Sequence, residues 1–271
     1  MTLKHACLAA LVALFVSPLQ SAERMPVAVI GTGDMGNSLG PRFSELGYQV
    51  FYGTRSPDSE RTRALLKKTG GGAKAMSGRE AAESADLIVL AVGWPAMRKV
   101  ALDLGDTDGK VIIDISTAAK QDEDGYFSSV VETSSAEMIQ QWNPGASVVK
   151  AFAVQASYVV DDPGVVGGPV SVPIAADDPK AKEQVARIVA DMGMDPFDAG
   201  PLRYSREIEA FARLYMVPLL QRRQAGWEPY FRRSYFWECE WTDEYSDPVA
   251  DHDSLANVPE TQGPGRPCPG Y

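Results

Sequence analysis

Residues 27–36, Val-Ala-Val-Ile-Gly-Thr-Gly-Asp-Met-Gly, decide the fold. The first four are apolar and mostly β-branched, which predicts a short strand buried in a parallel sheet. Gly31, Gly33 and Gly36 follow at G-x-G-x-x-G spacing, where the strand should turn into a helix. The first glycine permits a tight turn, the second lets a pyrophosphate approach the backbone, and the third lets helix and strand pack closely. The unpaired N–H groups that open such a helix also suit phosphate oxygens.

The residues after the next predicted strand, 49–52, indicate which dinucleotide is bound. A site for NAD usually has an acidic residue there, about 20 residues beyond the glycines, which holds the ribose 2′-hydroxyl. This chain has Thr54, Arg55 and Ser56 instead. An isolated arginine in such a loop is an ordinary solvated residue, but a guanidinium between two hydroxyls also suits a 2′-phosphate dianion. After the glycine motif, this turn predicts NADP(H) rather than NAD.

Composition excludes several classes of function. The chain has 271 residues, of which 45% are hydrophobic, enough for one or two domains with a sizeable core. Its formal net charge of −10 argues against a nucleic-acid-binding surface. Three cysteines without a C-x-x-C pair, and two histidines without H-E-x-x-H, give no indication of a metal site or of a Ser-His-Asp hydrolase.

Residues 1–22 are expected to be a signal peptide. Lys4 precedes an apolar run over 6–16, and two small residues follow at 21–22, a pattern typical of secretory signals. The run is too short to remain as a membrane span. The mature chain is therefore expected to be exported, periplasmic or secreted, with no stable membrane span after signal removal. The alternative is that translation starts at Met25 and that the protein is cytoplasmic.

Residues 236–271 are predicted to form an irregular tail. Acidic residues through Asp253 are followed by a stretch rich in proline and glycine. Such a composition cannot bury a core, so the tail is expected to be mobile. Cys239 and Cys268 could pair there in an oxidising compartment.

Between these ends, residues 23–235 are predicted to form one α/β domain. Strands and helices alternate, which favours a single Rossmann-like, doubly wound parallel sheet with a C-terminal helix. Pro41 lies in the first helix, which it should kink or shorten, and 121–126 is predicted to be a polar loop. The predicted strands are 27–30, 49–52, 73–76, 86–92, 111–115, 147–152, 170–175 and 196–198, and the helices after the first are 59–68, 77–85, 96–104, 134–141, 178–192 and 203–223.

Five motifs together resemble those of one family, the deazaflavin (coenzyme F-420)-dependent NADP oxidoreductases, and of the related NADPH-binding domain of six-transmembrane metalloreductases. The resemblance covers about residues 27–218. It implies a single Rossmann domain that holds NADPH and passes hydride to a flavin-like ring. Besides the glycine motif, the matching segments are Tyr-Gly-Thr-Arg-Ser at 52–56, Ala-Val-Gly-Trp-Pro at 91–95, Val-Val-Lys-Ala-Phe at 148–152 and Asp-Ala-Gly-Pro-Leu-Arg-Tyr-Ser-Arg at 198–206.

The resemblance assigns cofactor-binding roles position by position. It implies that the glycine turn faces the pyrophosphate, that the turn after the second strand faces the 2′-phosphate, and that the residues after the fourth strand lie along the nicotinamide. The residues in that order are Gly31, Thr32, Gly33, Asp34, Met35 and Gly36, then Thr54, Arg55 and Ser56, then Val92, Trp94 and Pro95.

Two departures from the family concern the hydride acceptor. Ala153 stands where the family commonly has Asn, and Thr117-Ala118 stands where Asn-Pro often follows the fifth strand. Both missing amides would lie near the ring of the acceptor. Gln155 is a candidate substitute for one of them, and Tyr204 and Arg206 are candidates for contacting an acceptor.

The expected activity needs little acid–base chemistry. Hydride transfer between stacked rings depends on close positioning and exclusion of water, so no catalytic side chain is predicted. The resemblance implies an NADP(H)-dependent oxidoreductase whose small-molecule hydride acceptor is deazaflavin coenzyme F-420 or a flavin. A non-catalytic NADP(H)-binding or sensory protein is the alternative from another class. A hydroxy-acid, ketone or imine reductase is a third possibility, but too little chain follows Asp198 for the large helical domain of those enzymes. The sequence does not indicate an oligomeric state.

Overall fold

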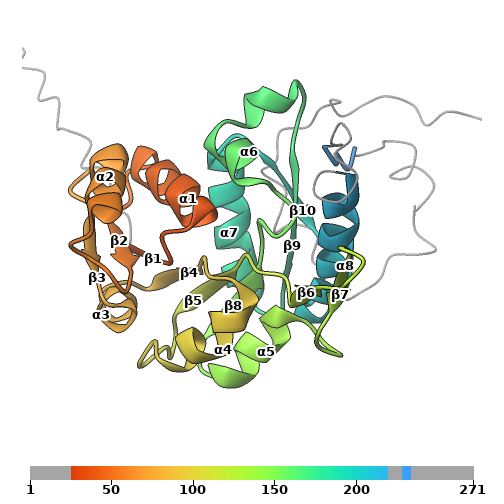
Figure 1. The fold of residues 1–271 in the computed structure, drawn as a ribbon, viewed down its shortest axis with the longest axis horizontal. Helices are drawn as coiled ribbons and strands as arrows, with labels where there is room; N and C mark the ends of the chain where they lie inside the picture. Colours follow the sequence, from red (N-terminus) through yellow and green to blue (C-terminus); the bar gives the residue numbers. More distant parts are fainter. Residues whose placement is uncertain (1–25, 219–227, 233–271) are drawn as a thin grey trace, which may run out of the picture.

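The computed structural model describes residues 26–218 and 228–232, and within them eight strands form one sheet in the order β10-β9-β8-β5-β4-β1-β2-β3 (Figure 1). Strands alternate with helices along the chain, which confirms the predicted α/β, Rossmann-like class. Every predicted strand is present, with its ends shifted by at most two residues. The strands are β1 (Val27–Ile30), β2 (Val50–Gly53), β3 (Lys74–Met76), β4 (Leu87–Leu90), β5 (Val111–Asp114), β8 (Ser147–Lys150), β9 (Ser171–Ala176) and β10 (Asp195–Asp198).

The sheet is mostly parallel rather than wholly so. From β3 through β2, β1, β4 and β5 to β8, each strand is parallel to its neighbour. β9 pairs antiparallel with β8, with Val149 opposite Ala176, and β10 is parallel to β9. The chain enters β9 at the edge of the sheet where β8 ends, without crossing back over the sheet. β9 and β10 therefore run in the direction opposite to the other strands. Nothing in the buried, apolar sequence of β9 distinguishes the two directions.

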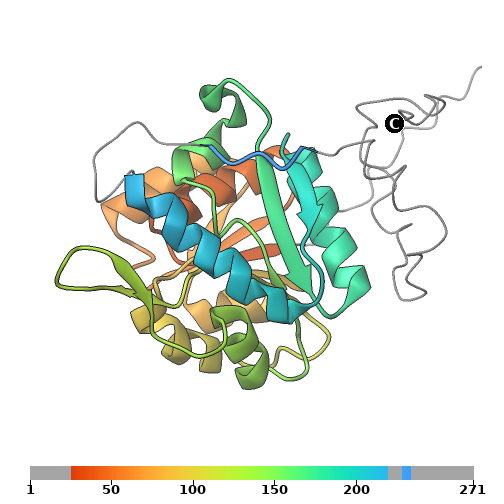
Figure 2. The ribbon, with the colours of Figure 1, turned by 90° about the vertical axis from the view of Figure 1, so that its right-hand side faces the viewer.

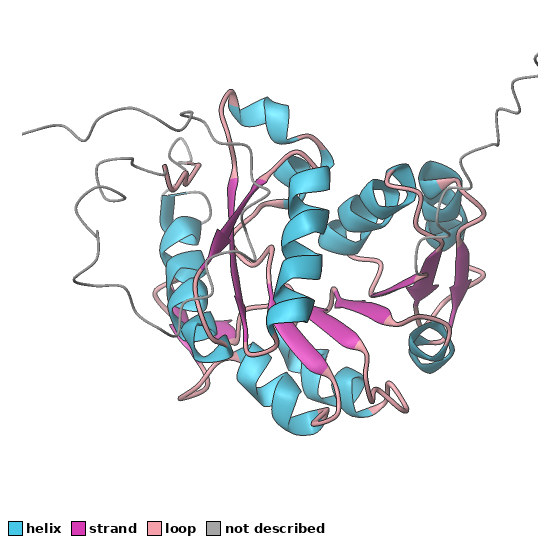
Figure 3. Cartoon of the chain, turned by 180° about the vertical axis from the view of Figure 1, so that it is seen from behind, coloured by secondary structure: helices cyan, strands magenta, loops and turns pink. Residues whose placement is uncertain are grey.

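Helices cover both faces of the sheet (Figure 3). Because side chains alternate along a strand, Val27 and Val29 of β1 belong to the core under α1 and α7, whereas Ala28 and Ile30 belong to the core under α3 and α4. On the second face, α8 lies across β9 (Figure 2). The first face carries α1 (Asp34–Glu45), α2 (Glu60–Thr69), α6 (Ser157–Asp161) and α7 (Pro179–Asp191), and the second α3 (Gly78–Glu83), α4 (Trp94–Leu102), α5 (Ser135–Trp142) and α8 (Ser205–Met216).

Four of these helices begin at a side-chain cap. Ser59 precedes α2, Ser77 precedes α3, Ser134 precedes α5 and Asp178 precedes α7, and each accepts a hydrogen bond from a backbone N–H in the first turn. Ser77 and Glu80 form a capping box, in which the side chain of each accepts a hydrogen bond from the backbone N–H of the other. Each cap satisfies a free donor at the start of its helix and fixes where the preceding loop ends.

Pro41 lies inside α1 without shortening it. The helix continues to Glu45, so of the two predicted effects, a kink or an early end, the early end does not occur. Proline has no N–H, which leaves the carbonyl of Asn37 without its helical partner. Lys68 of α2 donates a hydrogen bond from Nζ to this carbonyl oxygen at 2.9 Å. The lysine therefore satisfies the exposed acceptor and joins the two helices.

The segment between β5 and α5 contains a hairpin that the sequence did not predict. β6 (Ala119–Gln121) pairs antiparallel with β7 (Phe127–Ser129) around the predicted polar loop. Gly125 in this loop has a φ of +86°, a conformation that glycine adopts readily. Both strands are short and largely exposed, so no apolar pattern marks them. The short helices α6 and η1 (Pro163–Val166) are likewise absent from the sequence-based prediction.

The predicted C-terminal helix begins as a 3₁₀ turn, η2 (Leu202–Tyr204), and continues as α8. Its predicted part beyond residue 218 lies outside the described residues. The predicted signal peptide, the tail at 236–271 and the pair Cys239 and Cys268 also lie outside them. Within the described ranges, no helix is both long and apolar enough to cross a membrane.

Candidate functional site

The carboxyl ends of β1 and β4 mark the point where the strand order changes direction. From β1 the chain continues to β2 on one side, and from β4 to β5 on the other. Gly31 donates its N–H to the carbonyl of Gly53 at 2.9 Å, and Ala91 donates to the carbonyl of Ile30 at 2.8 Å. The turns after β1, β2 and β4 are therefore joined at one edge of the sheet. In doubly wound sheets, ligands bind in the crevice at such a switch point.

The three positions after β1 that are occupied by glycine differ in how much space they leave for a side chain. Gly31 has a φ of +116°, and a Cβ there would lie 2.3 Å from the carbonyl oxygen of Ala91. A Cβ on Gly36 would lie 2.1 Å from the carbonyl oxygen of Gly31. By contrast, a Cβ on Gly33 would meet no heavy atom of the protein within 4 Å. The fold requires the first and third glycines, and the second leaves open space that fits a group from outside, such as a pyrophosphate.

The start of α1 offers unpaired donors to that space. Gly33 is the N-cap and provides no side-chain cap, unlike the residues that begin α2, α3, α5 and α7. The N–H groups of Asp34, Met35 and Gly36 therefore suit an anion at the positive end of the helix dipole. Asp34 is exposed, whereas the side chain of Met35 packs against the core, so Met35 can offer only its backbone. Thr32 is partly buried in the turn itself.

Gly33→Ala is expected to leave the fold intact and to weaken dinucleotide binding. The φ of −73° suits any residue, and the added methyl has room within the protein. Because the methyl would stand where the pyrophosphate approaches, NADPH and NADH should both bind at least about tenfold more weakly than to the wild type. Calorimetric titration measures this loss, and thermal unfolding should show an unchanged midpoint.

Gly36→Ala is the matched control for that variant. Its Cβ would lie 2.1 Å from a backbone oxygen, so this variant should lower the thermal midpoint. A Gly33→Ala protein that binds both nucleotides as the wild type does would contradict the assignment of the turn.

The turn after β2 holds Arg55 between two hydrogen-bonded hydroxyl residues. Thr54 donates its N–H to the carbonyl of Met76 at 2.9 Å, and Ser56 donates its N–H to Oγ1 of Thr54 at 3.2 Å. Arg55 is exposed, and within the described ranges its guanidinium has no hydrogen-bond or ion-pair partner. Since β1 and β2 are parallel neighbours, with Ile30 opposite Gly53, this turn lies beside the glycine turn. The guanidinium is therefore free to bind a phosphate there.

The residues after β4 open α4. Gly93 is the N-cap without a side-chain cap, and the helix begins at Trp94, two residues earlier than predicted. Pro95 is exposed in the first turn, and Val92 packs partly against the core. The indole of Trp94 stacks on Trp142 of α5, with ring centroids 6.1 Å apart. This stack fixes the start of α4 beside the switch point.

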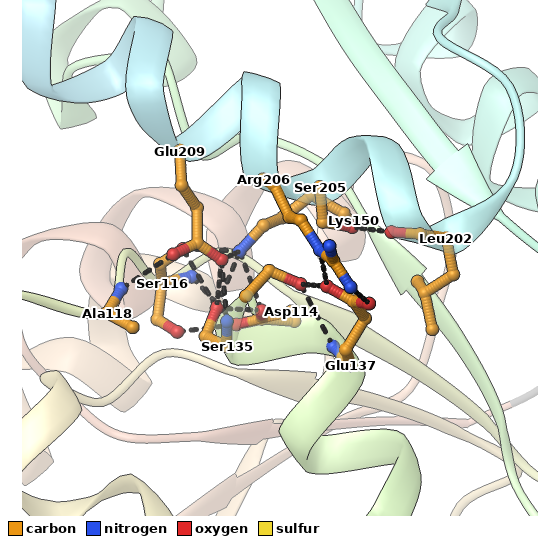
Figure 4. Close-up of polar contacts among 11 residues, drawn as sticks. Asp114, Ser116, Ala118, Ser135, Glu137, Lys150, Leu202, Ser205, Arg206 and Glu209 are labelled. Atoms are coloured by element: carbon orange, nitrogen blue, oxygen red, sulfur yellow. Dashed lines mark hydrogen bonds and ion pairs between the residues drawn. The ribbon is translucent and has the colours of Figure 1, made fainter. Parts of the chain in front are cut away.

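A buried charge cluster lies at the carboxyl ends of β5 and β8 (Figure 4). Lys150 and Asp114 have 0% exposure. The ammonium of Lys150 donates to Oδ2 of Asp114 at 2.7 Å and to the carbonyl oxygen of Ser116 at 2.5 Å, and it lies 3.0 Å from Oε1 of Glu209. Oγ of Ser135 lies 2.5 Å from Asp114 Oδ2 and 2.7 Å from Glu209 Oε1. The cluster joins β5, β8, α5 and α8.

Glu209 connects α8 to two other parts of the chain. Its Oε2 accepts a hydrogen bond from the N–H of Ala118 at 2.9 Å, and its Oε1 accepts one from the N–H of Ser135 at 2.7 Å. Burial alone would lower the pKa of Lys150, but the attraction of Asp114 and Glu209 outweighs it and raises that pKa. The ammonium therefore stays charged and holds the loop after β5 in place.

Lys150 was predicted only as part of a family motif, and Asp114 and Glu209 were not among the predicted site residues. The sequence does carry a signal for Asp114 and Lys150. Asp114 follows the apolar run 111–113 and Lys150 follows the apolar run 148–149, each within a predicted buried strand. A charge in such a strand requires an opposite charge close by. Glu209 has no comparable signal, because it lies on an amphipathic helix where charged residues are common.

The two predicted acceptor contacts on the C-terminal side have other partners. Arg206 donates from Nε and Nη2 to the carboxylate of Glu137, at 2.9 and 2.6 Å. This bidentate pairing lowers the pKa of Glu137. Tyr204 is 41% exposed, and the guanidinium of Arg203 lies over its ring, 5.4 Å from the centroid. Arg206 thus joins α8 to α5, and no described contact directs it to the crevice.

The loop after β8 follows a constrained path. Phe152 is buried and has a φ of 57°, which a non-glycine residue seldom adopts. Gln155 is 6% exposed and donates from Nε2 to the carbonyl oxygen of Ser171 at 2.8 Å. Its Oε1 is buried and has no partner within the described residues. The predicted substitute for a ring-side amide is therefore anchored to β9.

Comparisons with known proteins support the predicted resemblance. Residues 26–118 match the sequence model of a family described as NADP oxidoreductase, coenzyme F420-dependent. Metalloreductase STEAP3 of Rattus norvegicus is 29% identical over 188 residues, which cover 69% of this chain and 36% of that protein. Metalloreductase STEAP2 of Homo sapiens is 26% identical over 200 residues, covering 72% and 37%. The chain thus matches little more than a third of the length of these relatives.

A solved structure is similar over its whole length. The crystal structure of a candidate F420-dependent NADP reductase from Arthrobacter sp. FB24 has a TM-score of 0.71 and 25% identity, and the match covers 78% of this chain and 100% of that chain. The family match at 26–118 contains the glycine turn, the turn at 54–56 and the start of α4.

Proposed function

We propose that this chain binds NADP(H) at the switch-point edge and transfers hydride between the nicotinamide and a deazaflavin or flavin-like acceptor. The starting point is the match of residues 26–118 to the sequence model of a family of NADP oxidoreductases.

The open space at Gly33 carries the proposal. A Cβ there would meet nothing of the protein, although the position is glycine and stands at the uncapped start of α1. A phosphate group in that space would accept hydrogen bonds from the first N–H groups of the helix. Arg55, in the neighbouring turn, has a free guanidinium for a second phosphate. Two adjacent anion sites fit a dinucleotide that carries a 2′-phosphate.

The described residues would bind and orient rather than exchange protons. When bound, NADPH supplies the hydride, and no protein acid is needed for its transfer. The start of α1 would hold the pyrophosphate, and Thr54, Arg55 and Ser56 would hold the 2′-phosphate. The Lys150 cluster would keep the loops after β5 and β8 rigid on the nicotinamide side, where a two-halved dinucleotide fold places its second nucleotide.

A deazaflavin is the favoured acceptor because of the Arthrobacter relative, whose description names F420. Ala153 and Thr117 have no side-chain amide, so they cannot supply the ring-side amides that the family resemblance predicts. An acceptor bound more loosely, such as a flavin, would tolerate their absence better. The proposal therefore ranks the deazaflavin above flavin mononucleotide and both above ketones or hydroxy acids.

One observation favours a second function, NADP(H) binding without turnover. Arg206, the cationic candidate for contacting an acceptor, is engaged by both oxygens of Glu137. Lys150 is likewise fully engaged within the buried cluster. A protein that senses NADPH would need no acceptor contacts and would be compatible with this internal pairing.

The test follows NADPH absorbance in the presence of each acceptor. We expect oxidation with the deazaflavin, slower oxidation with flavin mononucleotide and little with simple ketones or hydroxy acids. Fast turnover of a ketone would contradict the proposed acceptor class. Tight NADPH binding without oxidation by any acceptor would assign the non-catalytic function instead.

A further inference from the structure

The turn that contains Arg55 is hydrogen-bonded to a buried residue of the next helix. Thr62 is the third residue of α2 and is only 2% exposed. Its Oγ1 donates a hydrogen bond to the carbonyl oxygen of Ser56 at 2.9 Å. This bond runs from the first turn of α2 back toward the N-terminus. It reaches Ser56, which lies three residues before the N-cap, Ser59. No helix-capping requirement explains it, because Ser59 already caps Thr62 N–H at 3.2 Å.

The direction of each hydrogen bond in this group is fixed by counting protons. Thr62 Oγ1 has one proton, and the Ser56 carbonyl can only accept, so Thr62 donates to Ser56. The hydroxyl of Ser59, 2.9 Å from Thr62 Oγ1, must then donate to Thr62. Ser56 in turn donates its N–H to Thr54 Oγ1. The result is one chain of hydrogen bonds from α2 through Ser56 to Thr54, and Arg55 lies inside it.

We propose that Thr62 is a positioning residue for 2′-phosphate specificity: its buried hydroxyl holds the Thr54–Ser56 turn so that Arg55, Thr54 and Ser56 converge on one phosphate. The inference rests on the proposed NADP(H) function. A long arginine side chain gains most from a phosphate when its backbone is already fixed, because less conformational freedom is lost on binding. Thr62 itself is buried beneath the turn and would not touch the nucleotide.

Thr62→Val tests the inference, because valine keeps the shape and removes the hydroxyl. The measured quantity is the ratio of the Kd for NADH to the Kd for NADPH, on one preparation of the full chain. This ratio is independent of the fraction of folded protein. We expect it to fall about three- to tenfold, mainly through weaker NADPH binding. Thr62→Ser restores the hydroxyl and should return the ratio to within about twofold of the wild type.

Thr69→Val is the matched control on the same helix. Thr69 is also buried, and its Oγ1 donates to the carbonyl of Leu65 at 2.9 Å and lies 2.7 Å from the hydroxyl of Tyr52. Removing the Thr69 hydroxyl should lower the stability of the fold about as much as removing the Thr62 hydroxyl does. It should leave the ratio of the Kd for NADH to the Kd for NADPH unchanged. A purely structural role for Thr62 would make the two valine variants indistinguishable in this ratio.

A double variant separates this inference from the proposed function. In the Arg55→Ala background, Thr62→Val should cause no further change in the ratio, because the residue through which it acts is gone. If the wild type prefers NADPH and Arg55→Ala removes the preference, while Thr62→Val keeps the wild-type ratio, the inference is overturned and the proposed function stands. If the wild type has no preference for NADPH, the proposed function fails and the inference fails with it.

Discussion

Lys150→Met is expected to destabilise the folded chain by about 3–5 kcal/mol, the cost of breaking a buried ion pair by removing one partner. Methionine fills a similar volume but leaves Asp114 and Glu209 buried without a cation. Both carboxylates lie within 3.0 Å of the Lys150 ammonium, and neither is more than 2% exposed. Urea denaturation measures the loss as a lower midpoint at an unchanged slope.

Lys68→Met is the matched control for that substitution. Lys68 pairs with Asp161 at 3.4 Å, but both side chains are more than 40% exposed. Exposed pairs contribute about 0–1 kcal/mol, and water can replace Lys68 at the exposed carbonyl of Asn37, so this variant should stay close to the wild type. If Lys150→Met cost no more than Lys68→Met, the cluster would not hold the carboxyl ends of β5 and β8 together.

Arg55→Ala is expected to weaken NADPH binding by about 1.5–3 kcal/mol, about 10- to 150-fold, and to leave NADH binding almost unchanged. The exposed guanidinium has no partner within the described residues, so its removal costs the fold little. Only NADPH carries the 2′-phosphate that this side chain would bind. Calorimetric titration of both nucleotides into the variant and the wild type measures the difference.

Arg187→Ala serves as the control for overall charge. Arg187 is exposed on α7 and pairs with Glu183 of the same helix. Its removal changes the net charge by the same amount and should affect neither nucleotide. Equal losses of NADPH and NADH affinity in Arg55→Ala would mean that Arg55 does not read the 2′-phosphate.

The part of the fold from β1 to β5 could be predicted from sequence because its signals are local. A buried apolar run, three spaced glycines and the helices predicted from Ser59 and Ser77 lie within short windows, and the structure has each of them within one residue of its predicted start. The glycine turn is an example. Packing requires Gly31 and Gly36, as their predicted roles demand, whereas a Cβ on Gly33 would meet no atom of the protein.

The C-terminal side was harder to predict because its determinants are long-range. The reversal of β9 depends on which edge the chain reaches after β8. The charge cluster depends on Glu209 meeting Lys150 and Asp114, residues that are far apart in sequence. Arg206 was a candidate for contacting an acceptor, yet its guanidinium pairs with Glu137 of α5. In each case the decisive partner comes from another part of the fold, and no local pattern names it.

Calorimetric titration of NADPH and NADH into the wild-type protein tests the central claim most directly. The anion site at the start of α1 should bind the pyrophosphate of either nucleotide, and the Arg55 turn should bind the 2′-phosphate of NADPH alone. We therefore expect NADPH to bind at least about tenfold more tightly than NADH. Equal affinities for the two nucleotides, or no binding of either, would contradict the account.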